Sequence, residues 1–181
     1  MATYLVTGGA GFIGSHVVEE LVRRGESVRV LDSLSRGHEE NLAALRDRIQ
    51  FHKLDIRDLD GMRSAFRGVD HVVHEAAFSS VPRSIAGPAT CNSINVDGTL
   101  NVLIAARDAG VKRRVFAASA AVYGNSPLLP RTETQEPQPR SRYGLTKLVS
   151  SLRREGYARI SADSASRIVA EIGEANNQAR K

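Results

Sequence analysis

The sequence contains no tryptophan, and aromatic residues of all kinds make up only 5% of its 181 residues. Single-stranded nucleic acids bind by stacking their bases on aromatic rings beside a basic groove. Here the lysines and arginines are scattered, with no basic run among interleaved aromatics. The net charge of +5 is therefore interpreted as an ordinary solvated surface, and we expect no nucleic-acid partner.

A single cysteine, Cys91, excludes an internal disulfide, and no metal-ligand spacing surrounds it. No stretch approaches the ~20 apolar residues that a membrane-spanning helix needs. Residues 1–6 also lack the basic start and apolar core of a signal peptide. We expect no metal site, no membrane association and a cytoplasmic location.

Apolar runs of strand length alternate with helical patterns along most of the chain. Strands are expected at residues 3–7, 27–31, 49–54, 71–74 and 114–118, and helices at 12–24, 39–46, 59–66 and from 88 to 110. Five strands separated by helices favour a parallel sheet that is covered on both faces. The sequence therefore predicts an α/β fold, a doubly wound parallel sheet of the Rossmann type.

The C-terminal part of the chain follows a different pattern. Residues 124–140 contain four prolines and are expected to form a loop, and residues 141–156 are expected to form a helix. The segment from 157 to 181 is polar and shows only a weak helical pattern. We divide the chain into a Rossmann domain, residues 1–150, and a divergent tail, residues 151–181, that is helical or partly disordered.

A glycine-rich loop lies between the first expected strand and the first expected helix. Gly8 permits a tight turn, Gly11 lets a pyrophosphate approach the backbone closely, and Gly14 lets the helix pack against the sheet. The helix N-terminus adds free N–H donors and a partial positive charge. This spacing in a strand–turn–helix context indicates a dinucleotide-binding site.

Asp32 ends the second expected strand, about 20 residues after the glycines. A carboxylate there accepts hydrogen bonds from the adenosine ribose hydroxyls and repels a 2′-phosphate, so it favours NAD over NADP. Arg36 lies close by and can pair with a 2′-phosphate, which leaves NADP as the alternative cofactor. A second alternative for Asp32 is a cap on a helix or turn.

Tyr143 and Lys147 are spaced one helical turn apart, on one face of an expected helix. A free tyrosine has a pKa near ~10, and a neighbouring ammonium group lowers it by stabilising the phenolate. Tyr143 could then exchange a proton with a substrate hydroxyl while hydride moves to the cofactor. Ser119, expected at the end of the fifth strand, could hydrogen-bond the same oxygen. A tyrosine and a lysine with this spacing are more often an ordinary surface pair. Here their position after the glycine loop, Asp32 and Ser119 favours a catalytic role.

With these motifs in place, the sequence resembles the extended short-chain dehydrogenase/reductases, the NAD-dependent epimerase/dehydratase family. The resembling segments occur in family order between about residues 3 and 150. They are TGGAGFIGSH (7–16), Asp32, LDIRD (54–58), HEAA (74–77), SVPRSI (80–85), INVDGTLNVL (94–103), ASAAVYG (118–124) and YGLTK (143–147).

The resemblance implies roles for particular residues. The catalytic positions are Ser119, Tyr143 and Lys147. The positions expected to contact NAD are Gly8, Gly11, Phe12, Ile13, Gly14, Asp32, Asp55, Ile56, Ala76, Ala77 and Asn95, together with Tyr143 and Lys147. Of these, Asp55 and Ile56 match positions that contact adenine, Ala76 and Ala77 flank the pyrophosphate and ribose, and Asn95 lies behind the active site.

Within the family, the segment HEAAFSSVPRSI is most similar to UDP-sugar 4-epimerases, including the N-acetylhexosamine type. The resemblance implies that hydride leaves C4 of a UDP-hexose or UDP-N-acetylhexosamine and returns to the other face. Related dehydratases carry an Asp–Glu pair where this chain has Ala120 and Ala121, which argues against dehydration. The resemblance also implies a homodimer, built on the long helix after Pro88 and on the Tyr143 helix.

Two departures from the family pattern leave other functions open. Arg142 stands where the family usually has proline, and the resemblance ends near residue 150, without the C-terminal part that binds the nucleotide sugar. One alternative is therefore a non-catalytic NAD-binding module or inactive fragment. The other is a nucleotide-sugar dehydratase or reductase of the same family.

Overall fold

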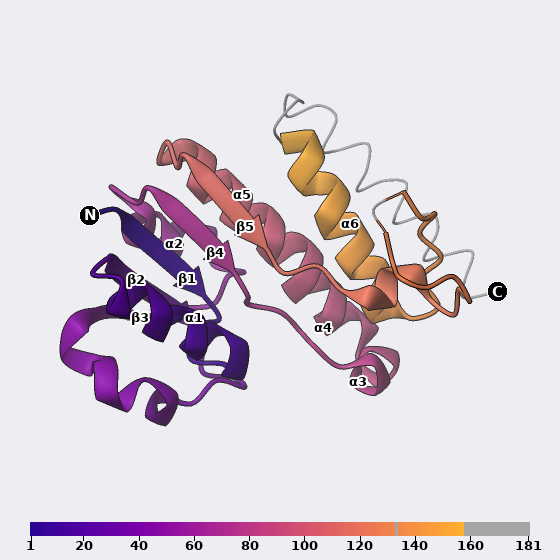
Figure 1. Cartoon of the computed structure of the whole chain (residues 1–181), viewed down its shortest axis with the longest axis horizontal. Coiled ribbons are helices and arrows are strands. Elements are labelled where there is room, and N and C mark those ends of the chain that lie inside the picture. The colour runs from indigo at the N-terminus through magenta and orange to yellow at the C-terminus, as the bar shows by residue number, and fades with distance from the viewer. Residues whose placement is uncertain (133, 158–181) are drawn as a thin grey trace.

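The computed structural model describes residues 1–132 and 134–157, which form one parallel sheet with helices around it (Figure 1). The sheet order is β3-β2-β1-β4-β5, and all neighbouring strands are parallel. The strands are β1 (Thr3–Thr7), β2 (Ser27–Asp32), β3 (Ile49–Lys53), β4 (His71–His74) and β5 (Arg113–Phe116). The order reverses between β1 and β4, and ligands bind at such a switch point in doubly wound sheets. The expected fold class is confirmed.

Two apolar clusters cover the two faces of the sheet. Successive residues of β1 point to opposite faces, so that Leu5 belongs to one cluster and Val6 to the other. The Leu5 face is covered by α2 (Leu59–Phe66) and α5 (Thr99–Asp108), and the Val6 face by α1 (Phe12–Arg23) and the 3₁₀ helix η1 (Glu39–Arg48). Leu5, Val6 and Thr7 of the central strand are all buried, because helices cover both faces of the sheet at this point.

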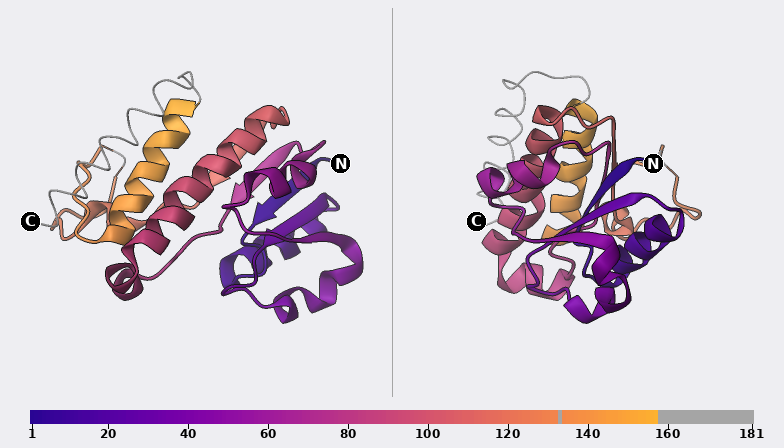
Figure 2. Two further views of the ribbon diagram at one scale, coloured as in Figure 1. Left: turned by 180° about the vertical axis from the view of Figure 1, so that it is seen from behind. Right: turned by 90° about the vertical axis from the view of Figure 1, so that its left-hand side faces the viewer.

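The expected helix from residue 88 to 110 is present but is not uniform. It comprises α4 (Pro88–Asn92), a π-helical segment η2 (Ser93–Gly98) and α5. Helix α6 (Arg142–Tyr157) lies alongside this run, as both views in Figure 2 show. Short π-helical segments inside longer helices occur frequently at functional sites, and this one contains Asn95.

Two local predictions need correction. Strand β5 ends at Phe116 instead of residue 118, so Ser119 lies beyond the strand and precedes the short 3₁₀ helix η3 (Ala120–Tyr123). Helix α3 (Val81–Ala86) was not expected, because six residues are too few to show a helical period. It forms because Pro82 lies in its first turn and the Ser80 side chain accepts a hydrogen bond from the Arg83 N–H group.

The tail is only partly described. Residues 151–157 continue α6, and residues 158–181, on which the expectation of a helical or disordered segment falls, lie outside the described residues. Within the described ranges, none of the helices has the length and apolar character needed to cross a membrane. The same part of the chain contains no group of three metal-ligating side chains.

Candidate functional site

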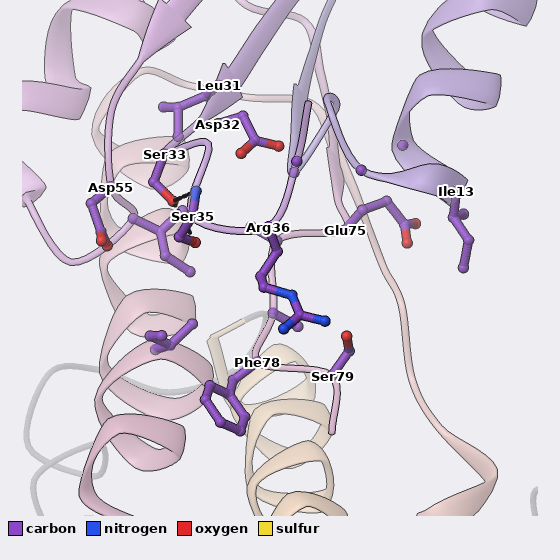
Figure 3. A pocket seen from close by; sticks show the side chains of 18 of the residues that line it. Ile13, Leu31, Asp32, Ser33, Ser35, Arg36, Asp55, Glu75, Phe78 and Ser79 are labelled. Atoms are coloured by element: carbon purple, nitrogen blue, oxygen red, sulfur yellow. Dashed lines mark hydrogen bonds between the residues drawn. The ribbon is translucent and has the colours of Figure 1, made fainter. Parts of the chain in front are cut away.

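A cavity of about 520 Å³ lies at the carboxyl ends of β1, β2 and β4 (Figure 3). Ten of the residues expected to contact a dinucleotide line it. They are Gly8, Gly11, Phe12, Ile13, Gly14, Asp32, Asp55, Ile56, Ala76 and Ala77. Asn95, Ser119, Tyr143 and Lys147 do not line this cavity. The structure thus gathers the residues expected around the cofactor into one cavity and places the expected catalytic residues outside its lining.

The glycine loop leaves no room for side chains where it meets the rest of the protein. A Cβ atom on Gly8, whose φ is +71°, would lie 2.5 Å from the backbone nitrogen of Ala76. One on Gly14 would lie 2.2 Å from the carbonyl oxygen of Gly8. For a Cβ atom on Gly11 the nearest atom would be that same carbonyl oxygen, at 3.2 Å, and no other described atom would lie within 4 Å. Gly8 and Gly14 are therefore required by packing, and Gly11 keeps the cavity wall open to a ligand.

The N-terminus of α1 is available to an anion. Gly11 is the N-cap residue of α1, none of the described side chains caps this end, and the first turn contains no acidic residue. The first N–H groups of a helix have no partner within the helix, and their partial positive charge favours a phosphate. The open wall at Gly11 and this helix end together fit the pyrophosphate of a dinucleotide.

Asp32 is held rigidly at the end of β2. It is 8% exposed, and its carboxylate accepts hydrogen bonds from the N–H groups of Ala10 at 3.0 Å and of Leu34 at 2.8 Å. The first bond ties Asp32 to the glycine loop, and both leave lone pairs on the carboxylate oxygens. Asp32 therefore acts in the fold as a turn-stabilising group, as the alternative interpretation held, and it still lines the cavity as a ribose-binding group would.

Two arginines lie near the acidic groups of the cavity. Arg57 pairs with Asp55 through two N–H···O bonds of 3.0 and 2.6 Å, which lower the pKa of the Asp55 carboxyl group. Arg36 lines the cavity beside Asp32. Its guanidinium group forms no ion pair with any of residues 1–132 and 134–157. Figure 3 shows its guanidinium group extended into the cavity. The site is thus less acidic than its carboxylates alone suggest.

Helix α6 carries Tyr143 and Lys147 one turn apart. The Lys147 ammonium group donates a 2.9 Å hydrogen bond to the carbonyl oxygen of Ala117 and lies 4.8 Å from the centre of the Phe116 ring. Lys147 is only 4% exposed. Burial of the charged form lowers its pKa to about 8, and the charge of Glu75 partly opposes that shift. Tyr143 is half-buried, and its backbone N–H group donates to the Ser84 hydroxyl group.

Ser119 is brought to the same corner by close packing between η3 and α6. A Cβ atom on Gly144 would lie 2.6 Å from the carbonyl oxygen of Ala121, so only glycine permits this approach beside Tyr143. The Ser119 hydroxyl group accepts a 3.2 Å hydrogen bond from the Ala121 N–H group, which leaves its own proton free to donate. The segment after β5 and the N-terminus of α6 therefore form one corner of the protein.

Asn95 is buried and joins three parts of the structure. Its amide oxygen accepts a 2.7 Å hydrogen bond from the Phe78 N–H group, and its amide nitrogen donates to the Phe78 carbonyl oxygen at 3.2 Å and to the Thr146 hydroxyl group at 2.9 Å. The Ser150 hydroxyl group donates to the Asn95 carbonyl oxygen. Asn95 thus fixes α6 and the segment after β4 to each other, beneath the site rather than in the cavity wall.

The sequence interpretation singled out neither His74 nor Glu75, although both lie within the HEAA motif. His74 is buried and is hydrogen-bonded to the hydroxyl groups of Thr7 at 2.6 Å and Thr99 at 3.0 Å. Burial lowers its pKa to about 3, so it is neutral at physiological pH. Glu75 lines the cavity. His74 is the last residue of β4 and Glu75 is the first residue after it, so the end of the strand separates a buried residue from one that lines the cavity.

These features define the class of protein. A doubly wound sheet, a glycine loop at its switch point, an acidic residue at the end of β2 and a Tyr–Lys pair on a later helix together describe a dinucleotide-binding oxidoreductase domain. Residues 4–162 match the NAD dependent epimerase/dehydratase family, and the chain belongs to that family. The match continues beyond residue 150, where the sequence interpretation placed the end of the resemblance.

Similar curated proteins are 4-epimerases. The chain is 45% identical over 148 residues to the UDP-glucose 4-epimerase of Streptomyces lividans, covering 80% of this chain and 44% of that protein. It is 42% identical over 147 residues to the putative UDP-glucose 4-epimerase of Methanocaldococcus jannaschii, covering 80% and 47%. The chain therefore spans less than half the length of these two relatives.

Solved structures agree with this relationship. The UDP-glucose 4-epimerase of Thermus thermophilus in complex with NAD superposes with a TM-score of 0.81 at 42% identity, covering 87% of this chain and 51% of that one. The UDP-N-acetylglucosamine 4-epimerase of Methanobrevibacter ruminantium M1, in complex with UDP-N-acetylmuramic acid, gives 0.81 at 36% identity, covering 86% and 50%.

Proposed function

We propose that this chain is the NAD-binding and catalytic half of a UDP-sugar 4-epimerase. The observation that carries the proposal is the cavity itself, in which an open glycine loop and a fixed Asp32 meet at the switch point of the sheet. The similar proteins described above support the reaction, because they are UDP-glucose and UDP-N-acetylglucosamine 4-epimerases.

The cavity residues would hold NAD in a fixed orientation. The N–H groups at the start of α1 would bind its pyrophosphate, and Asp32 would accept hydrogen bonds from the adenosine ribose. Asp55 and Ile56 would line the adenine position, with Ala76 and Ala77 beside the pyrophosphate and ribose. When bound, NAD would supply a hydride acceptor, and then a hydride donor, for oxidation and re-reduction of carbon 4 of the sugar.

The residues on and near α6 would move the proton. Tyr143 would take the proton of the sugar hydroxyl group as hydride leaves and return it when hydride comes back. The ammonium group of Lys147 would favour the phenolate form of Tyr143. Ser119 would donate a hydrogen bond to the same sugar oxygen, because its hydroxyl proton is not used in capping η3. Asn95 would act through its bonds to Thr146 and Phe78, by keeping α6 in place.

We propose a UDP-hexose or a UDP-N-acetylhexosamine as the substrate, and a homodimer formed through the α4–α5 run and α6. A second function, an NAD-binding module without turnover, is favoured by one observation. Ser119, Tyr143 and Lys147 lie outside the lining of the cavity that would hold NAD.

Two measurements on the purified chain separate these functions. Isothermal titration with NAD tests the cavity, and conversion of UDP-glucose or UDP-N-acetylglucosamine to its C4 epimer tests the reaction. In an active protein, Tyr143→Phe should retain NAD binding and lower kcat by about 100-fold or more, the range expected for loss of a positioned general acid–base. NAD binding without epimerisation by the wild-type chain supports the non-catalytic module. Failure to bind NAD overturns both.

A further inference from the structure

We propose that Glu75 makes the cavity select the oxidised form of the dinucleotide over the reduced form. This inference rests on the proposed function, because it assumes that NAD occupies the cavity. It concerns a different property, namely which redox state of the coenzyme the chain binds more tightly.

The position of Glu75 is fixed by the backbone of the sheet. Its N–H group donates a 3.0 Å hydrogen bond to the carbonyl oxygen of Thr7 at the end of β1. The next N–H group, that of Ala76, donates to the Thr7 hydroxyl group at 3.4 Å. Figure 3 shows the Glu75 side chain in the cavity on the side of Ile13, away from Asp55. The carboxylate therefore lies at the end of the cavity opposite the adenine-binding residues of the proposed function.

Glu75 is the one carboxylate of the cavity that has no hydrogen-bond or ion-pair partner within the described part of the chain. Asp32 accepts hydrogen bonds from two N–H groups, and Asp55 is paired with Arg57. The charge that acts on Glu75 is that of Lys147, and the two groups affect each other without a direct salt bridge. Glu75 is therefore linked electrostatically to Lys147, a residue of the catalytic corner.

An anion at this end of the cavity discriminates between the two redox states. The nicotinamide ring carries a positive charge when oxidised and none when reduced, while the rest of the dinucleotide is unchanged. A carboxylate at the nicotinamide end attracts only the charged ring, and the attraction is strong in a partly dry cavity. Partial burial raises the pKa of Glu75 and the charge of Lys147 opposes that rise, so that Lys147 helps to keep the carboxylate ionised. Epimerisation begins with the oxidised form, so this preference would prepare the site for its first step.

The test measures the Kd of NAD+ and of NADH for the wild-type chain and for Glu75→Gln, which removes the charge and keeps the shape. We expect Glu75→Gln to weaken NAD+ binding about tenfold relative to NADH binding, or about 1.4 kcal/mol. Glu75→Asp should retain the wild-type ratio of the two Kd values, and so should Glu40→Gln, which removes an exposed charge from η1 outside the cavity.

ADP-ribose, which lacks the nicotinamide ring, separates a local charge effect from damage to the fold. It should bind Glu75→Gln and the wild-type chain equally, and weaker binding to the variant would overturn the inference. An unchanged ratio of the NAD+ and NADH Kd values in Glu75→Gln would overturn the inference while leaving the proposed function intact. Absence of binding of either dinucleotide to the wild-type chain would overturn both.

Discussion

The glycine loop and helix α6 both contribute to the proposed site, but they are attached to the protein by different interactions. The loop lies on the apolar core, where Ala10 and Val18 belong to the cluster that covers one face of the sheet. Within the described residues, helix α6 buries the apolar side chain of Val149 but contributes no side chain to either apolar cluster. Its buried anchors include the hydroxyl groups of Thr146 and Ser150, which are hydrogen-bonded to Asn95.

The two kinds of attachment respond differently to the removal of a single side chain. Apolar packing is spread over many contacts, and removal of one side chain destabilises the whole domain through the cavity that it leaves. A buried hydrogen-bond network depends on a few groups, and removal of one group leaves its partners without a bond. We therefore expect core substitutions to act on the entire fold and network substitutions to act first on α6.

The largest effect is expected for Phe66→Ala in α2. Phe66 is fully buried in the cluster shared by α2, α5 and the sheet. Removal of a buried phenylalanine side chain costs about 3–5 kcal/mol. Denaturant unfolding should show this loss in one cooperative transition, with the glycine loop and α6 unfolding together. Separate transitions for the two regions would show that the structure of α6 does not depend on this cluster.

A somewhat smaller effect is expected from acid acting on His74. The unfolded chain protonates this histidine as the pH falls through 6.5, whereas the folded protein keeps it neutral down to about pH 3. The unfolded state therefore binds more protons in this window, and the free energy of unfolding decreases as the pH falls. Between pH 6.5 and pH 4 the loss should be about 3 kcal/mol from this group alone.

His74→Gln isolates that contribution, since glutamine can hydrogen-bond to Thr7 and Thr99 but does not titrate. Unfolding free energies measured at pH 6.5 and pH 4 should differ less in this variant than in the wild-type chain by about that amount. An identical pH dependence in the two proteins would show that His74 is not kept neutral by burial.

The sequence predicted the glycine-loop region better than it predicted the catalytic corner. Gly8, Gly11, Gly14 and Asp32 can be identified because the spacing of a strand, a tight turn and a helix is local in the sequence. The parallel sheet follows from the alternation of apolar runs and helical patterns, and the parallel pairing of all neighbouring strands confirms it.

The corner around α6 depends on contacts that no local pattern reveals. The bond between Asn95 and Thr146 joins residues 51 positions apart, and the π-helical segment that carries Asn95 looks like ordinary helix in the sequence. Glu75 was not recognised either. Its lack of a partner in the cavity depends on where Arg57 and Lys147 lie in three dimensions.

The smallest effect, and the sharpest comparison, is expected for Asn95→Leu. Leucine has a similar volume but removes the bonds that Asn95 makes to the two Phe78 backbone groups and to the Thr146 hydroxyl group. Each buried group left without a partner costs about 1–3 kcal/mol, and the burial of an apolar side chain in place of an amide offsets much of that cost, so we expect a net loss of about 2 kcal/mol. Amide hydrogen exchange should accelerate in α6 and change little in β1.

Asn101→Leu is the matched control, because Asn101 lies on the same helical run and donates to the carbonyl oxygens of Ile56 and Arg57 instead. It should leave exchange in α6 at the wild-type rate. Equal acceleration of α6 and β1 in Asn95→Leu would mean that the network supports the sheet as much as the helix, and the difference between the two regions would not hold.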